Sequence, residues 1–272
     1  MLFYFKIQQY YSRGATMNPE LIVKLSLDIG AAMLSSGAET IRVEDTVTRI
    51  CRTYYQGSLD VTSYLSALFV SMEVTDWDET SACPRIITQH RRVTSISHSL
   101  DKLEDLNELS RYICAHKPDP QDIQERLQNI LNYKMSLKRG IIGYILASSG
   151  FAVFFGGDLI DAFFCCLICL LLYYLDNKIH IHFNNELIRI FVLSFIMGLP
   201  ACLLELSPIP VHMDKIMIGS VMLLIPGVAL TNSLRDLFTG DTVSGALKLL
   251  NSILLAVAIA FGFALSMIIT GV

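Results

Sequence analysis

Long apolar stretches in the second half of the chain constrain its fold more than any other feature. Of the 272 residues, those up to position 139 carry 16 of the 21 Lys and Arg and 17 of the 25 Asp and Glu. The rest of the chain is dominated by apolar runs close to the length that crosses a bilayer. One water-soluble globule is therefore excluded, and we expect a mainly α-helical membrane protein with a polar domain preceding the membrane domain.

We expect three parts. Residues 1–16 are either a loose tail or lie upstream of the true start, because Met17 precedes a clear helix beginning. Residues 17–139 are predicted to form a cytoplasmic α+β domain, and residues 140–272 a bundle of transmembrane helices. Five spans are expected, at residues 141–157, 159–175, 187–204, 216–234 and 246–271.

Within the polar domain, Asn18 suits a helix N-cap, Pro19 suits the first helical position, and Gly37 should end that helix. From Ser58 the hydrophobic period changes from that of helices to that of strands. The resulting expectation is a helix from Pro19, a second from about residue 38, strands over 59–74 and 84–93 with a turn at 76–81, and helices over 100–113 and 122–137.

Two helical faces of this domain are rich in charge. One carries alternating signs and is either a solvated face or a docking surface. The other carries only carboxylates and is either solvated or a binding site for a divalent cation. The first consists of Glu39, Arg42, Asp45 and Arg49, and the second of Asp101, Glu104, Asp105 and Glu108.

Polar groups at the membrane suggest where transport chemistry could lie. Asp158, Asp161 and Glu205 are expected at the outer ends of spans, where they either couple proton movement or cap helices. Pro226-Gly227 falls inside the fourth expected span and should break it, freeing backbone groups to line a cavity, although a simple packing kink is the alternative. Pro200 could break the third span in the same way.

Basic residues flank the spans mostly on one side, which predicts a cytoplasmic amino terminus and an outside carboxyl terminus. A net charge of −4 gives no electrostatic footprint for nucleic acid. The sequence also lacks the motifs of nucleotide-binding, zinc-hydrolase and serine-hydrolase enzymes. We therefore expect neither an enzyme nor a bound cofactor or metal.

Two stretches resemble the threonine/serine exporter family: SGAETIRVED at residues 36–45 and IPGVALTNSLRDLFTGDTVSG at residues 225–245. The resemblance extends from about Met17 to the carboxyl terminus. The motif residues of the cytoplasmic stretch are Glu39, Arg42 and Glu44. The resemblance makes the motif residues of the membrane stretch candidates for the substrate path, and these are Pro226, Gly227, Asn232, Arg235, Asp236, Gly240, Asp241 and Gly245.

The resemblance implies secondary active export from the cytoplasm, driven by the proton-motive force. Some members of the family carry this module and a second, smaller set of spans in one polypeptide. The present chain resembles more closely the larger subunit of the two-component succinate exporter type, in which the two sets of spans are separate proteins. We thus expect a bacterial inner-membrane exporter of succinate or threonine/serine that works with a small membrane subunit and can form homo-oligomers. The alternative is a membrane-anchored sensor or scaffold whose cytoplasmic domain binds a ligand.

Overall fold

The structure, a computed structural model, describes residues 18–64, 66–74, 85–93, 98–133, 136–179 and 185–272. The tail at 1–16, the alternative start at Met17 and the turn expected at 76–81 lie outside these residues. The chain forms two compact units, of which one comprises Met1–Tyr133 with Arg235–Ser244 and the other Lys134–Leu234 with Gly245–Val272. Both are mainly helical, and the only sheet among the described residues has three strands.

The first unit begins as its capping residues predict. The side-chain oxygen of Asn18 accepts a hydrogen bond of 3.0 Å from the backbone N–H of Glu20, and Pro19 is the first helical residue. Gly37 has a φ of +90°, which only glycine adopts without strain, and the helix ends just before it. The elements are α2 (Pro19–Ser35), α3 (Thr40–Tyr54), β1 (Leu59–Tyr64), β2 (Ala67–Val74), β3 (Arg85–Arg92), α4 (Leu100–His116) and α5 (Pro120–Asn132).

The sheet is an antiparallel meander in the order β1-β2-β3. Leu59 pairs with Met72 across the first ladder, and Val74 pairs with Arg85 across the second. Along β2 the side chains of Leu68, Val70, Met72 and Val74 are buried and those between them are less so. One face of the sheet therefore belongs to the core, as period-two alternation predicts.

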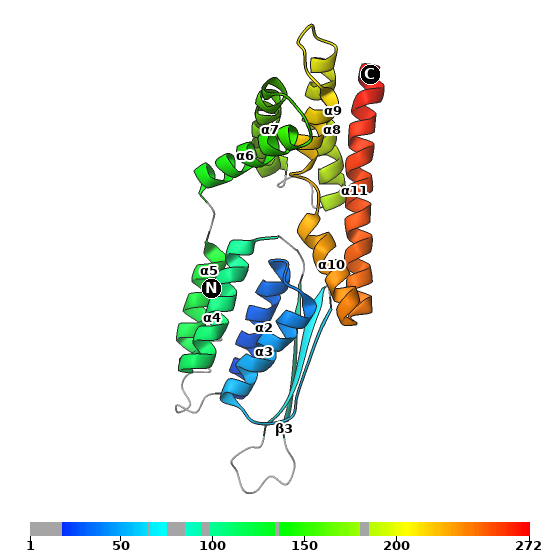
Figure 1. The fold of residues 1–272 in the computed structure, drawn as a ribbon. Helices are drawn as coiled ribbons and strands as arrows, with labels where there is room; N and C mark the ends of the chain where they lie inside the picture. The colour runs from blue at the N-terminus through cyan, green and yellow to red at the C-terminus, as the bar shows by residue number, and fades with distance from the viewer. Residues whose placement is uncertain (1–17, 65, 75–84, 94–97, 134–135, 180–184) are drawn as a thin grey trace, which may run out of the picture. The chain divides into compact units, whose positions relative to one another are not determined.

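The first unit has three layers (Figure 1): the sheet, then α2 with α3, then α4 with α5. Gly30 lies where α2 packs closely on both β2 and α3. A Cβ at this position would lie 2.6 Å from a side-chain atom of Leu68 in β2 and 2.7 Å from one of Val47 in α3. Buried apolar residues from all three layers form one continuous core that includes Ile29, Val43, Leu68, Leu106, Ile113 and Ile123. This core holds α3, whose first turn carries the cytoplasmic motif, in a fixed position.

The second unit contains α6 (Leu137–Phe154), α7 (Leu159–Ile179), α8 (Glu186–Glu205), α9 (Met213–Val221), most of α10 (Gly227–Thr239) and most of α11 (Thr242–Thr270). Within the described residues, four helices are long and apolar enough to cross a membrane: α6, α7 up to Asp176, α8 and α11. These correspond to four of the five expected spans. The helix expected over 122–137 is shorter than predicted, because α5 ends at Asn132.

The fourth expected span, residues 216–234, is not one helix. The chain leaves the helical conformation after Val221, passes through turns, and resumes a helix at Gly227, directly after Pro226. The carbonyl of Pro226 accepts the first bond of α10, from the N–H of Leu230 over 2.9 Å. The expected break at Pro226-Gly227 is therefore confirmed, and it divides the fourth expected span into two short helices, α9 and α10.

Pro200 behaves differently from Pro226, and the expectation of a break there is wrong. Helix α8 continues through Pro200 from Glu186 to Glu205. Its neighbour Gly198 packs against Ser266 of α11, and Gly262 of α11 packs against Ser194 of α8. This reciprocal packing of small residues brings the backbones of α8 and α11 close together next to Pro200.

Candidate functional site

The segment Arg235–Ser244 belongs to the same compact unit as the amino-terminal domain. It begins in the last turns of α10 and turns at Gly240, which has a φ of +96°. The N–H of Gly240 donates to the carbonyl of Leu237 over 3.3 Å, and the N–H of Asp241 donates to that of Asp236 over 2.9 Å. These two bonds define a Schellman cap, so the Gly240-Asp241 pair of the membrane motif forms a helix-terminating turn.

An ion pair joins the two motifs. The guanidinium of Arg235, at the end of α10, contacts the carboxylate of Glu39, the N-cap residue of α3. The Glu39 side chain is 11% exposed, whereas that of Arg235 is 59% exposed. The cation thus keeps one side open to solvent while its partner carboxylate is nearly enclosed.

A hydrogen bond beside this pair joins the next residue of each motif. The hydroxyl of Thr40 donates to the carboxylate of Asp236 over 3.2 Å, and Asp236 is 1% exposed. Thr40 is the first residue of α3. The Asp236 carboxylate therefore lies at the amino-terminal end of α3.

Glu44 lies one turn further along α3 and faces the sheet. Its carboxylate accepts a hydrogen bond of 2.7 Å from the backbone N–H of Ser63 in β1. Burial raises the pKa of Glu44 above its ordinary value, the Ser63 hydrogen bonds lower it, and the nearby charge of Asp241 raises it further. Glu39, Glu44, Arg235, Asp236 and Asp241 consequently form one cluster, called here the motif cluster.

The rest of the charged face of α3 is solvated. Asp45 and Arg49 form an exposed ion pair of 2.7 Å within the helix, and Arg42 is exposed without an ion pair among the described residues. Glu39 departs from this pattern because it is nearly buried against Arg235. Of the charged face of α3, Arg42, Asp45 and Arg49 are therefore solvated, whereas Glu39 takes part in a contact with another segment of the chain.

The remaining motif residues lie in the second unit. Pro226 and Gly227 form the helix break, Asn232 lies one turn before Asp236 in α10, and Gly245 is buried in α11. Asn232 is half-buried. Along the chain, α10 begins at the helix break and ends at the residues that contribute to the motif cluster.

A second cluster lies in the second unit, at the beginnings of α7 and α9. Asp161 is fully buried, and its two carboxylate oxygens accept hydrogen bonds from the backbone N–H of Asp158 (2.9 Å), the backbone N–H of His212 (2.8 Å) and His212 Nδ1 (2.9 Å). The bond from Asp158 is the reciprocal half of a capping box at the start of α7. Asp161 therefore caps a helix and also binds the connection between α8 and α9.

Glu205 has a related local contact. One of its carboxylate oxygens accepts a hydrogen bond of 3.2 Å from the N–H of Met213, the first residue of α9. One side-chain atom each of Asp158, Asp161 and His212 lie within 4.8 Å of one another. Since both Asp161 oxygens already accept protein hydrogen bonds, we interpret this group as a hydrogen-bond cluster.

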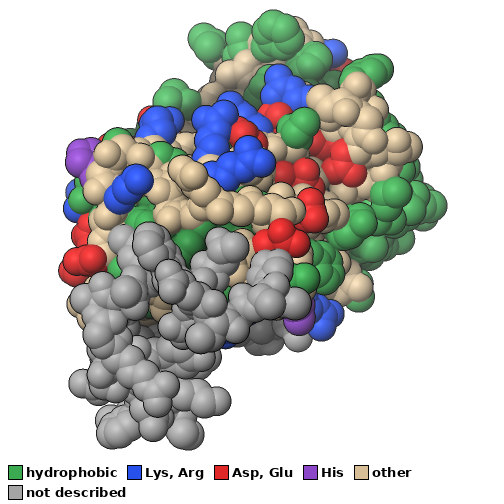
Figure 2. Space-filling view, turned by 90° about the horizontal axis from the view of Figure 1, so that it is seen from below, with side chains coloured by type: hydrophobic (Ala, Val, Ile, Leu, Met, Phe, Trp, Pro, Cys, Tyr) green, Lys and Arg blue, Asp and Glu red, His purple; other side chains and the backbone are tan. Residues whose placement is uncertain are grey.

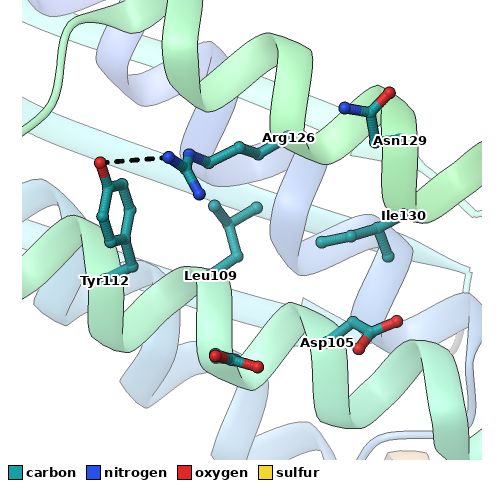
Figure 3. A pocket seen from close by; sticks show the side chains of 7 residues that line it. Asp105, Leu109, Tyr112, Arg126, Asn129 and Ile130 are labelled. Atoms are coloured by element: carbon teal, nitrogen blue, oxygen red, sulfur yellow. Dashed lines mark hydrogen bonds between the residues drawn. The ribbon is translucent and has the colours of Figure 1, made fainter.

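The acidic face of α4 contributes to a groove with α5. The groove has a volume of about 380 Å³, and its lining includes Asp105 and Glu108 of α4 and Arg126 of α5. Figure 3 shows Arg126 reaching across to Tyr112, with the guanidinium 4.1 Å from the ring centre and bonded to the phenol oxygen over 3.3 Å. Arg126 also contacts Asp122 over 2.9 Å. The groove is therefore of mixed charge, and its cation is engaged within the protein.

Charge is similarly mixed elsewhere on the surface. Figure 2 shows one face of the molecule on which Lys and Arg side chains gather beside Asp and Glu. The face carries no extended field of a single sign.

Three participants were not singled out from the sequence. Thr40 lies inside the cytoplasmic motif, and membership of the motif could have singled it out. Its hydrogen-bond partner, Asp236, is 196 residues away and could not be found from the sequence. Ser63 contributes mainly a backbone N–H, which no sequence pattern reveals. His212 lies 51 residues from Asp161, in a short polar connection between apolar runs.

Comparison with known proteins agrees with these motifs. The family model of the threonine/serine exporters, ThrE, matches residues 24–270. No curated protein and no solved structure matches the chain. The matched region includes both motifs, the break between α9 and α10, and the four apolar helices. This chain is a membrane protein that belongs to the threonine/serine exporter family.

Proposed function

We propose that the protein exports small carboxylate-bearing metabolites, threonine and serine or succinate, from the bacterial cytoplasm across the inner membrane. The proton-motive force drives export, and a smaller membrane subunit completes the path. The observation that carries this proposal is that both family motifs meet in the motif cluster, where Arg235 contacts Glu39. A transporter of carboxylates needs a cation that can exchange one carboxylate for another, and this ion pair has that chemistry.

In the proposed mechanism, Arg235 receives the substrate from the cytoplasm. Because its side chain is 59% exposed, a substrate carboxylate can reach the guanidinium while Glu39 still holds the other side. Replacing Glu39 by the substrate conserves one charge-assisted pair at Arg235, and the displaced Glu39 carboxylate then has to move into solvent, because a buried unpaired charge is costly. Asp236, held by Thr40, keeps the end of α10 in place during this exchange.

Beyond Arg235, the path follows α10 towards the helix break. Asn232 lies one turn away, and the amides that open α10 after Pro226 provide a positive helix end for an anionic group. In the proposed topology, α9, the break and α10 together cross the membrane as one interrupted span. This crossing places the amino terminus in the cytoplasm and the carboxyl terminus outside, in agreement with the flanking basic residues.

The test is uptake of labelled threonine, serine and succinate into inside-out vesicles under an imposed proton gradient. Vesicles contain this chain alone, the chain with the candidate small subunit, or neither, and a protonophore removes the gradient. Accumulation that requires both proteins and the gradient is the expected result. Absence of flux for every label, with both proteins shown to be inserted, would contradict the proposal and favour a sensor or scaffold.

A further inference from the structure

We propose that His212 binds the proton that drives export, with Asp161 as its partner carboxylate. This inference rests on the proposed function and identifies the coupling residue within it. The sequence directed attention to the carboxylates Asp158, Asp161 and Glu205, whereas the structure places an imidazole among them. Proton coupling requires a group that can gain and lose a proton near neutral pH, and histidine is the side chain whose ordinary pKa lies in that range.

The geometry separates the two roles. Asp161 has a fully buried side chain and accepts three hydrogen bonds, two of them from backbone N–H groups that do not titrate near neutral pH. The third donor, His212 Nδ1 at 2.9 Å, belongs to a side chain that is 56% exposed. Of these three described donors, the imidazole alone is a titratable group that is open to protons from solvent.

The charges around His212 favour the protonated ring. The hydrogen bond and the charge of Asp161 raise the pKa of His212 above its ordinary value, and the charges of Asp158 and Asp214 add to this effect. Lys215 is occupied by Asp214 over 2.7 Å, and Glu205 accepts the N–H of Met213. The ion pair with Asp161 is thus fully formed below the ordinary pKa of histidine and is lost as pH rises through the raised pKa.

Protonation of His212 can be transmitted to the proposed path. His212 is the N-cap residue of α9, and α9 leads directly to the break before Pro226. Along the way α9 packs on α7, where Cys165 Sγ lies 3.7 Å from the carbonyl of Ile216. The ion pair holds the start of α9 to the start of α7, so a change in the charge of His212 alters the restraint on the interrupted span.

The proton site is tested first without transport. The pKa of His212 is measured by NMR of the full chain, with histidine side chains labelled, in lipid nanodiscs. The account predicts a value above that of ordinary histidine, which falls in Asp161→Asn because the variant keeps the shape and removes the charge. A His212 pKa at or below the ordinary value, or one that Asp161→Asn leaves unchanged, would overturn the pairing.

Coupling is then tested in inside-out vesicles with His212→Asn, which keeps a donor near the Nδ1 position and cannot titrate in this range. A pH difference of one unit sustains at most about a tenfold substrate gradient at one proton per substrate. We expect the gradient to fall to about onefold in His212→Asn, while exchange of labelled for unlabelled substrate without a pH difference stays measurable. The matched control is His116→Asn, an exposed histidine of α4.

Accumulation by His212→Asn that equals that of the wild type would overturn the proposal. A wild-type protein that neither exchanges nor accumulates any label would instead refute the proposed function. The NMR titration would still decide whether His212 and Asp161 form a proton-binding pair. The two failures are therefore distinguishable.

Discussion

Thr40 and Asp236 are 196 residues apart in the chain, yet the Thr40 hydroxyl donates to the buried Asp236 carboxylate over 3.2 Å. The adjacent residues Glu39 and Arg235 form an ion pair. The two contacts join the start of α3 to the end of α10 within one compact unit. These contacts bring the cytoplasmic motif, residues 36–45, and the end of the membrane motif, residues 225–245, together in the folded chain.

The buried bond should contribute measurably to stability. Thr40→Val removes the hydroxyl with little change in shape and should lower the free energy of unfolding by about 1 kcal/mol. Asp236→Ala should cost more, about 1–3 kcal/mol, because partner groups lose a buried acceptor. Thermal unfolding of the full chain in detergent, for both single variants and the double variant, measures their coupling. Strictly additive losses would show that the hydroxyl and carboxylate do not stabilise each other.

The turn after α10 should require glycine. Gly240 has a φ of +96°, a conformation that costs an alanine about 1–2 kcal/mol. Gly240→Ala should therefore lower the unfolding temperature, and Gly240→Asn should lower it less because asparagine tolerates this region better. Equal stability of Gly240→Ala and the wild type would be inconsistent with the Schellman cap.

Close packing of α8 and α11 predicts a second effect on stability. A Cβ at Gly262 would lie 2.7 Å from the carbonyl of Phe191 and 2.9 Å from the N–H nitrogen of Phe195, both of them backbone atoms. Gly262→Ala should cost about 1–3 kcal/mol through overpacking. Gly143 of α6 has no heavy atom within 4 Å of the added Cβ, so Gly143→Ala serves as the control. If both variants unfold alike, the two helices are not in direct backbone contact.

Glu44 should make stability depend on pH. Because burial raises its pKa, the folded protein binds a proton here more tightly than the unfolded protein does. The charged form is thus penalised in the folded state, and stability falls as pH rises from the ordinary glutamate pKa through the raised one. Glu44→Gln should exceed the wild type in unfolding temperature above this window and match it more closely below. A difference that is independent of pH would argue against a raised pKa.

Local chemistry made much of the fold predictable. Asn18 and Pro19 mark a helix start and Gly37 marks its end, because capping and positive φ depend on neighbouring residues alone. The break at Pro226 was predictable for the same reason. Pro200 was misjudged, because α8 continues through it, and a proline in an apolar helix does not by itself decide whether the helix breaks.

The candidate site was predictable only in part. Membership of Glu39, Arg235 and Asp236 in the motifs could be read from the sequence, whereas their pairing depends on how α10 returns to α3. Similarly, Asp161 stood out as a carboxylate at a span end. Its partner His212 did not, because hydrophobic periodicity says nothing about which polar connections meet.

The exchange of carboxylates at Arg235 is the central claim, and substrate flux into inside-out vesicles tests it most directly. The account predicts that Arg235→Ala abolishes flux while the chain still inserts into the membrane, although stability falls because the nearly enclosed Glu39 carboxylate loses its cation. Arg49→Ala, which removes the exposed pair with Asp45 on α3, is the matched control and should transport like the wild type.

The charge-swapped variant Glu39→Arg with Arg235→Glu separates binding from structure, because it restores an ion pair without restoring a cation at the end of α10. It should remain inactive if Arg235 receives the substrate carboxylate. Normal flux by inserted Arg235→Ala, or recovery of flux in the swapped variant, would contradict the account.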